Sequence, residues 1–108
     1  MDTQLKRGVL EICVLAVLMR GESYGYQMIK DLSGCVTISE STLYPILKRL
    51  EKSGWVTVYM VEHNSRLRKY YRITGEGEHR ILEFLEEWKE MLGIYHFIEE
   101  KVTGGTEE

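Results

Sequence analysis

The 108-residue sequence holds a single proline and no long apolar run. Its longest uninterrupted apolar stretch is Ile12 to Met19, far shorter than the roughly 20 residues that a membrane-spanning helix requires. This stretch therefore predicts a buried helix of a globular protein. The first residues also lack the basic and apolar segments of a secretory signal, so we expect a cytoplasmic protein without a membrane partner.

Cysteine and histidine are scarce and scattered. Cys13 and Cys35 have no spacing typical of a disulfide framework or a zinc site, and we expect both to be free thiols. His63, His79 and His96 have no carboxylate or thiol partner at a catalytic spacing. The sequence therefore indicates neither an enzyme nor a metal or other cofactor.

Acidic residues outnumber basic ones, but the excess is confined to one end of the chain. Residues 1–74 contain 11 Lys/Arg and 7 Asp/Glu, a net charge of +4, whereas residues 75–108 contain 3 and 10, a net charge of −7. The overall value of −3 hides this difference. A basic N-terminal part suggests that this part of the protein faces a polyanion.

Apolar spacing predicts three helices in the basic part. Steps of three and four place one helix over residues 5–19, a second begins at Ser23 and ends before Gly34, and a third begins at Ser39 and ends at Ser53. Leu43, Ile46, Leu47 and Leu50 mark the inner face of the third helix. Pro45 lies in its second turn and should bend or tighten the start.

A strand pair and a long helix follow. Residues 55–62 and 69–73 are rich in Val, Thr and Tyr, and the polar residues 63–66 between them predict a hairpin turn. From Thr74 a helix extends to about Lys101. The predicted fold is mostly α with a small β-hairpin wing (α+β): a winged helix-turn-helix domain at 1–74, a C-terminal dimerisation helix at 75–101 and a disordered tail at 102–108.

This order of elements is that of a DNA-binding domain in which the third helix enters the major groove. The outward side of that helix carries hydroxyls near its start and cations further along, which can contact phosphates and base edges. The alternative is a solvated charged face. The candidate DNA-binding residues of this helix are Ser41, Thr42, Tyr44, Lys48 and Arg49.

The wing strengthens the DNA interpretation. Arg66, Arg68, Lys69 and Arg72 put four cations in seven residues, and the first three are candidate phosphate contacts. Protection of an edge strand explains a single cation but not the cluster. Tyr70 and Tyr71 alternate faces, so we expect one of them in the core.

Tyr24, at the expected start of the second helix, is a further candidate for a phosphate contact, and a structural role is the alternative.

Outside the basic part, the long helix predicts a dimer, because its apolar residues form a heptad-like seam with a second row beside it. One row can pack on its own domain while the other needs a partner. The candidate dimerisation residues are Ile81, Phe84, Leu85, Trp88, Met91, Leu92, Tyr95 and Ile98.

Three stretches of the sequence resemble the PadR family of bacterial transcriptional regulators. They are LAVLMRGESYGY at 15–26, STLYPILKRLEKSG at 41–54 and RKYYRITGEG at 68–77, in the order and spacing of the family. The resemblance implies a homodimeric winged-helix repressor that binds double-stranded DNA at a pseudo-palindromic operator. It also implies that Tyr44, Lys48 and Arg49 are recognition-helix contacts, and that Arg68 and Lys69 are wing contacts. The wing turn here lacks the Gly-rich tip common in that family.

The resemblance also implies a site for an effector. In multidrug-sensing members, a tryptophan on the last helix stacks planar aromatic molecules at the dimer centre, and Trp88 occupies the corresponding place. Gly8, Ile12 and Leu92 would lie around it in that geometry. The alternative is that Trp88 belongs to the dimer core.

A winged helix that binds another protein instead of DNA is the competing function, because one fold serves both uses.

Overall fold

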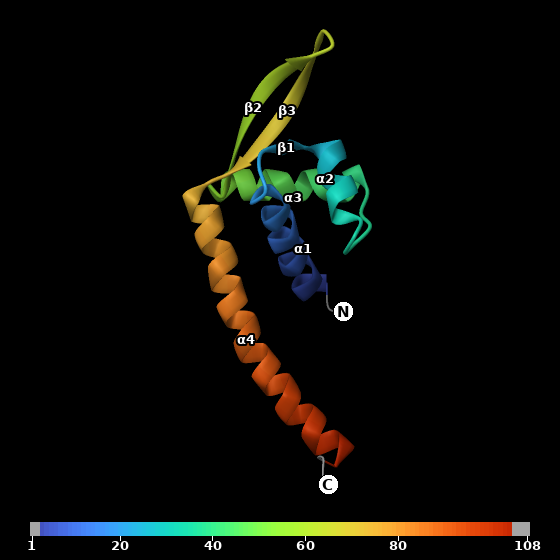
Figure 1. The fold of residues 1–108 in the computed structure, drawn as a ribbon, viewed down its shortest axis with the longest axis vertical. Helices are drawn as coiled ribbons and strands as arrows, with labels where there is room; N and C mark the ends of the chain where they lie inside the picture. Colours follow the sequence, from blue (N-terminus) through green and yellow to red (C-terminus); the bar gives the residue numbers. More distant parts are fainter. Residues whose placement is uncertain (1–2, 105–108) are drawn as a thin grey trace.

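The computed structural model describes residues 3–104. In chain order the elements are α1 (Thr3–Leu18), β1 (Ser23–Tyr24), α2 (Gly25–Leu32), α3 (Glu40–Lys52), β2 (Val56–His63), β3 (Arg66–Ile73) and α4 (Gly75–Thr103). Figure 1 shows α1, α2 and α3 gathered below a β-hairpin that projects away from them. The predicted winged helix-turn-helix with a long last helix is confirmed.

One core joins these elements. It contains the buried face of α1, Met28 and Leu32 of α2, the four predicted inner residues of α3, and Val56 and Tyr71 of the hairpin. Ile81 of α4 completes it, being 9% exposed. The helix α3 continues through Pro45, which lies on its exposed side. This core fixes the orientation of α3 relative to the hairpin.

The sheet has three strands in the order β1-β3-β2, all antiparallel, whereas the sequence predicted only the two-stranded hairpin. Ser23 pairs with Tyr71 and Tyr24 with Tyr70. A strand of two residues has no periodicity that could predict it, and Ser23 instead resembled a helix N-cap. The predicted turn is confirmed: Asn64 and Ser65 have φ values of 51° and 64°, as in a tight type I′ turn.

Two hydrogen bonds of the Thr74 side chain connect the start of α4 to the segment before β2. The Thr74 Oγ1 accepts a hydrogen bond from the Gly77 amide at 3.1 Å and donates one to the Gly54 carbonyl at 2.7 Å. The predicted N-cap at Thr74 is therefore confirmed. A side chain at Gly77 would collide with the Trp55 carbonyl, so glycine permits the close approach of α4 to the base of β2.

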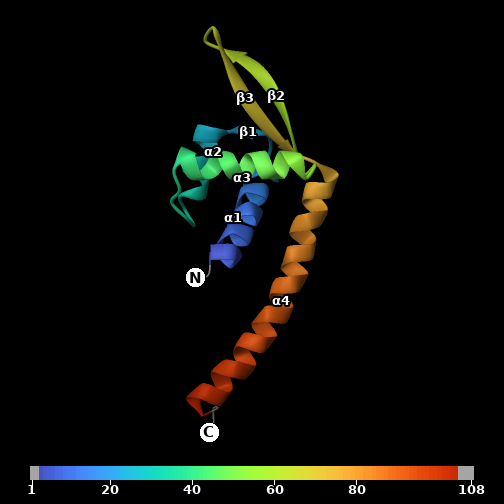
Figure 2. The ribbon, with the colours of Figure 1, turned by 180° about the vertical axis from the view of Figure 1, so that it is seen from behind.

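The helix α4 extends far beyond the domain. It has 29 residues and ends at Thr103, two residues past the predicted end, where Gly104 follows in the left-handed conformation. Its first half lies beside α1, and its second half projects into solvent in both views (Figures 1 and 2). The molecule consequently measures 66 × 26 × 22 Å. The predicted disordered tail overlaps the helix at 102–103, and its residues 105–108 lie outside the described part.

Candidate DNA interface

The outward face of α3 is built as the helical spacing predicted. Leu43 and Leu50 point into the core at 0% and 1% exposure, so the opposite side of the helix faces solvent. That side presents Ser41, Pro45, Lys48 and Lys52, all exposed. Within residues 3–104, neither lysine forms an ion pair. Both charges therefore remain available to an anionic partner.

Tyr44 lies on the flank of α3 that faces α2. Its side chain is 43% exposed, and its hydroxyl lies where a Cβ atom on Gly25 would be. The glycine of the YGY sequence thus lets the phenol of Tyr44 lie across the first residue of α2. Tyr71 of β3 is near as well: burial raises the pKa of Tyr71, and electrostatic interaction with Tyr44 and then Glu51 raises it further. Tyr44 is a half-exposed residue held from two sides.

Arg49 lies on the other flank, against α1. Its Nε donates a hydrogen bond to Glu11 Oε2 at 2.8 Å, and the two side chains are 37% and 21% exposed. The sequence placed Arg49 among the DNA contacts without indicating this partner. Its charge is already compensated within the chain, unlike those of Lys48 and Lys52.

Hydroxyl groups gather at the start of α3. Ser39 occupies the N-cap position, as predicted, but its side chain makes no capping bond to the backbone. Its Oγ instead lies 2.8 Å from Ser41 Oγ and 3.4 Å from Thr42 Oγ1. All three residues are exposed. The helix start therefore offers donors at a place where backbone N–H groups also favour anions.

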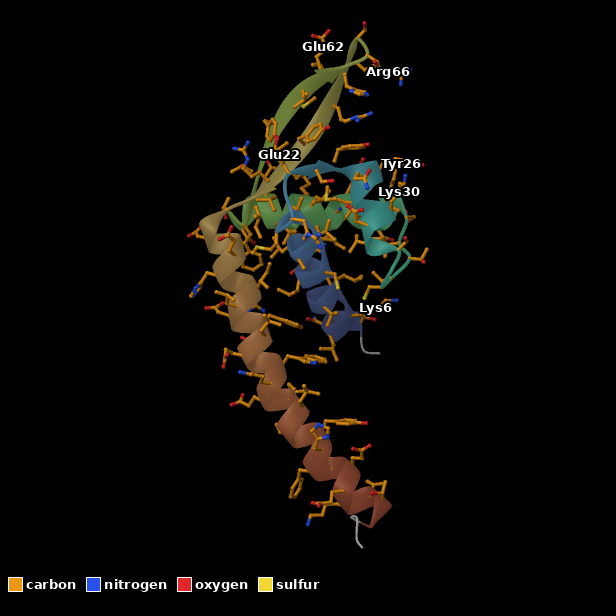
Figure 3. All side chains as sticks on the ribbon, viewed as in Figure 1. Lys6, Glu22, Tyr26, Lys30, Glu62 and Arg66 are labelled. Carbon is orange, nitrogen blue, oxygen red and sulfur yellow. The ribbon has the colours of Figure 1, made fainter. Side chains whose placement is uncertain are left out.

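The wing separates its cations onto two faces. Alternation along β3 puts Arg66, Arg68 and Arg72 on one side of the sheet, and Lys69 on the side of the buried Tyr71, as the register with β2 shows. Figure 3 shows Arg66 and Glu62 at the wing tip. The prediction that one of two adjacent tyrosines is core is confirmed by Tyr71, at 3% exposure. The four cations thus do not form one surface.

Tyr24 lies in an aromatic cluster on the side of the arginines. Its ring centroid is 5.4 Å from that of Tyr70, which is 5.8 Å from that of Tyr59. The Arg68 guanidinium lies 4.0 Å from the Tyr24 ring centroid, a cation–π distance. This contact holds Arg68 on β1 and gives Tyr24 a structural place between the body and the wing.

Glu22 adds an ionic contact beside this cluster, which the sequence did not reveal. Arg72 donates to Glu22 Oε1 from Nε at 3.1 Å and from Nη2 at 2.9 Å. The Tyr59 hydroxyl and then Arg72 lower the pKa of the Glu22 carboxyl. Only the pairing of β1 with β3 brings these residues together, so no local pattern could have predicted the contact.

The predicted dimerisation residues divide between the core and the surface. Ile81 is buried in its own domain and Phe84 packs against that core. Trp88 stacks on Phe84 with ring centroids 5.6 Å apart and planes at 18°, and keeps 38% of its surface exposed. The other predicted residues of the seam are all exposed: Leu85, Met91, Leu92, Tyr95 and Ile98.

The predicted effector residues are only partly gathered at one place. Ile12 is 8% exposed and belongs to the core of its own chain. Gly8 is exposed, and a Cβ atom there would meet nothing within 4 Å. Leu92 lies one turn of α4 beyond Trp88, with 43% of its surface exposed. A single chain therefore does not enclose a ligand between these residues.

The two cysteines were expected to be free thiols, and both are free in the structure, where they lie near one another. Burial raises the pKa of Cys13, and the neighbouring Cys35 raises it further. Within the described range 3–104, no group of His, Cys, Asp and Glu side chains is placed to hold a metal ion. No helix of that range is long and apolar enough to cross a membrane.

Comparison with known proteins identifies the family. The model of the transcriptional regulator PadR-like family matches residues 14–83. The chain belongs to this family. Its members are transcriptional regulators, which agrees with the expectation that the chain is not an enzyme.

Individual proteins resemble the chain over most of its length. A PadR-like transcription factor of Bacteroides fragilis is 33% identical, with a TM-score of 0.81 over 89% of this chain and 95% of that one. An uncharacterised protein of Lysinibacillus sphaericus is 33% identical over 82% of this chain and 85% of its own length. Bacillus subtilis PadR, solved in complex with operator DNA, is 27% identical with a TM-score of 0.64, over 71% of this chain and 45% of that protein.

Proposed function

We propose that this chain is a cytoplasmic homodimeric repressor that binds a pseudo-palindromic operator and releases it when a small molecule binds. In this proposal α3 enters the major groove, and the wing contacts the flanking backbone. The observation that carries it is a set of three exposed lysines, two on the outward face of α3 and one on the wing. Lys48, Lys52 and Lys69 form no ion pair with any described residue, although the chain is acidic overall. The operator complex of Bacillus subtilis PadR supports the same use of the fold.

The apolar surface of α4 supports the homodimer. Trp88, Leu92, Tyr95 and Ile98 are between 38% and 55% exposed on a helix whose second half touches no other element. An apolar surface of this extent is typical of an interface. A two-fold axis through α4 would present two copies of α3 to successive major-groove faces of one duplex.

Fluorescence anisotropy tests the DNA-binding proposal. The DNA upstream of the protein's own gene is compared with a shuffled duplex of equal length and composition, and we expect tighter binding to the first. Equal and negligible affinity for both would favour the protein-binding module instead. Sedimentation of the same sample checks the dimer.

Trp88 supports the effector part of the proposal, because two half-exposed indoles brought together would offer flat apolar faces to a planar aromatic molecule. We expect such molecules to quench the Trp88 emission and to release DNA. Trp55, at the base of the wing, is the internal control. The Trp88→Phe variant should lose the quenching and keep DNA binding. Unchanged emission across a panel of planar aromatics would contradict an effector site here.

A further inference from the structure

A groove between α1 and α3 combines an apolar floor with a cationic rim. Leu10, Pro45 and Ile46 provide the apolar part. The polar lining consists of Lys6, Arg7 and Arg49 together with the hydroxyls of Thr3, Ser41 and Thr42. None of the lining residues is acidic. A depression with three cations and three hydroxyls matches the chemistry of a sugar-phosphate backbone, which presents anionic oxygens beside apolar sugar carbons.

Two of these three cations form no ion pair with another described residue. Arg49 is paired with Glu11, but Lys6 and Arg7 are exposed and form no ion pair within residues 3–104. Figure 3 places Lys6 at the N-terminal end of α1, at the opposite end of the domain from Arg66 of the wing tip. The two cations therefore lie outside the helix and wing surfaces that the sequence analysis predicted to bind DNA.

The groove is continuous with the proposed recognition surface. Ser41 belongs both to the outward face of α3 and to the groove. The groove follows the flank of α3 that carries Arg49, whereas Tyr44 and Tyr71 place α2 and the wing on the other flank. DNA lying on α3 would thus meet cations on both sides of the helix, from the wing on one side and from α1 on the other.

From this continuity and charge we infer that the α1–α3 groove binds the phosphate backbone of the operator on the side of the recognition helix opposite the wing, with Lys6 and Arg7 as its contacts. This inference rests on the proposed function. It adds a third contact surface, whose two proposed contact residues, Lys6 and Arg7, lie before residue 14, where the family match begins. The contact is independent of sequence, because phosphates carry no base information.

The test compares the double variant Lys6→Gln/Arg7→Gln with a matched double variant on α4, Lys89→Gln/Lys101→Gln. Affinity for operator and shuffled duplex is measured between about 50 and 200 mM salt. We expect the α1 variant to weaken binding to both duplexes by a similar factor and to flatten the salt dependence by about 0.9 per lost phosphate contact. The α4 variant should bind as the unaltered protein does.

Ethylation interference locates the contact. In each half-site we expect two groups of sensitive phosphates, of which Lys6→Gln/Arg7→Gln removes one and Lys69→Gln removes the other. If the α1 variant keeps both groups and the full salt slope, the inference is wrong while the proposed function stands. If the unaltered protein does not prefer the operator, the proposed function itself fails. An α1 variant that sediments as a monomer would show that the groove is a subunit interface.

Discussion

Arg49 of α3 donates its Nε hydrogen to Glu11 of α1 across 2.8 Å, and this bond joins α3 to the helix behind it. Because both side chains are partly shielded, we expect a coupling of about 0.5–1 kcal/mol in a double-mutant cycle of Glu11→Ala and Arg49→Ala, measured by urea unfolding. Arg49→Ala should also change the salt slope of DNA binding less than Lys48→Ala. If both variants flatten the salt slope equally, Arg49 gives up its bond to Glu11 and contacts a DNA phosphate when DNA binds.

Lys69 is the wing cation on the same face as Tyr71, which lies near Tyr44 of α3. Its replacement by Ala should weaken binding to all sequences alike and flatten the salt slope by about one unit. Anisotropy titrations at several salt concentrations measure this, with Lys89→Ala as the control. An unchanged slope would remove this face of the wing from the interface.

Tyr44 should contribute to discrimination between sequences, because it is half exposed near the start of α3. We expect Tyr44→Ala to lower operator affinity by about tenfold, or about 1.4 kcal/mol, and affinity for the shuffled duplex by much less. Gly25→Ala should have a similar effect although it leaves the Tyr44 side chain in place, because its Cβ would displace the Tyr44 ring. If Tyr44→Ala instead abolishes folding in a thermal melt, the residue acts in the core.

Because the seam of α4 is exposed, we expect that its removal prevents dimerisation without preventing the domain from folding. A chain of residues 1–85 keeps Ile81 and Phe84, which pack on the domain, and loses Trp88, Leu92 and Tyr95. We expect it to fold, to sediment as a monomer and to bind operator no better than shuffled DNA. A chain of residues 1–104 is the control. Persistence of a dimer in the short chain would place the interface elsewhere.

Cys13 should be the slow thiol of the two, because only the thiolate is alkylated and burial raises its pKa. With iodoacetamide, mass spectrometry should show Cys35 modified first. The Cys13 rate should still be rising above about pH 8.5, the ordinary thiol value. Since burial is the largest cause of the shift, Cys35→Ser should leave Cys13 slow. Fast labelling of Cys13 in that variant would assign the shift to its neighbour.

Elements that depend on the spacing of nearby residues could be predicted from the sequence. The apolar rows of α3 and α4, the N-cap at Thr74 and the turn at 63–66 depend on neighbours within a few residues. Contacts between distant segments could not. The pairing of Ser23 and Tyr24 with β3, and the bond from Arg49 to Glu11, need the folded chain to exist. The sequence therefore predicted candidate DNA-binding residues, but not which of them form ion pairs within the chain.

The helix α4 has a further consequence for backbone dynamics. Isolated helices of about 12–15 residues are marginal in water, and beyond the region of Trp88 no other described element of the chain packs against α4. In a separated subunit, amide hydrogens in the first half of α4 should be protected by the domain, while those around Tyr95 and Ile98 should exchange with solvent almost as fast as in an open chain. If the protection of these distal amides increases with protein concentration, the protected residues show which part of α4 the second subunit covers.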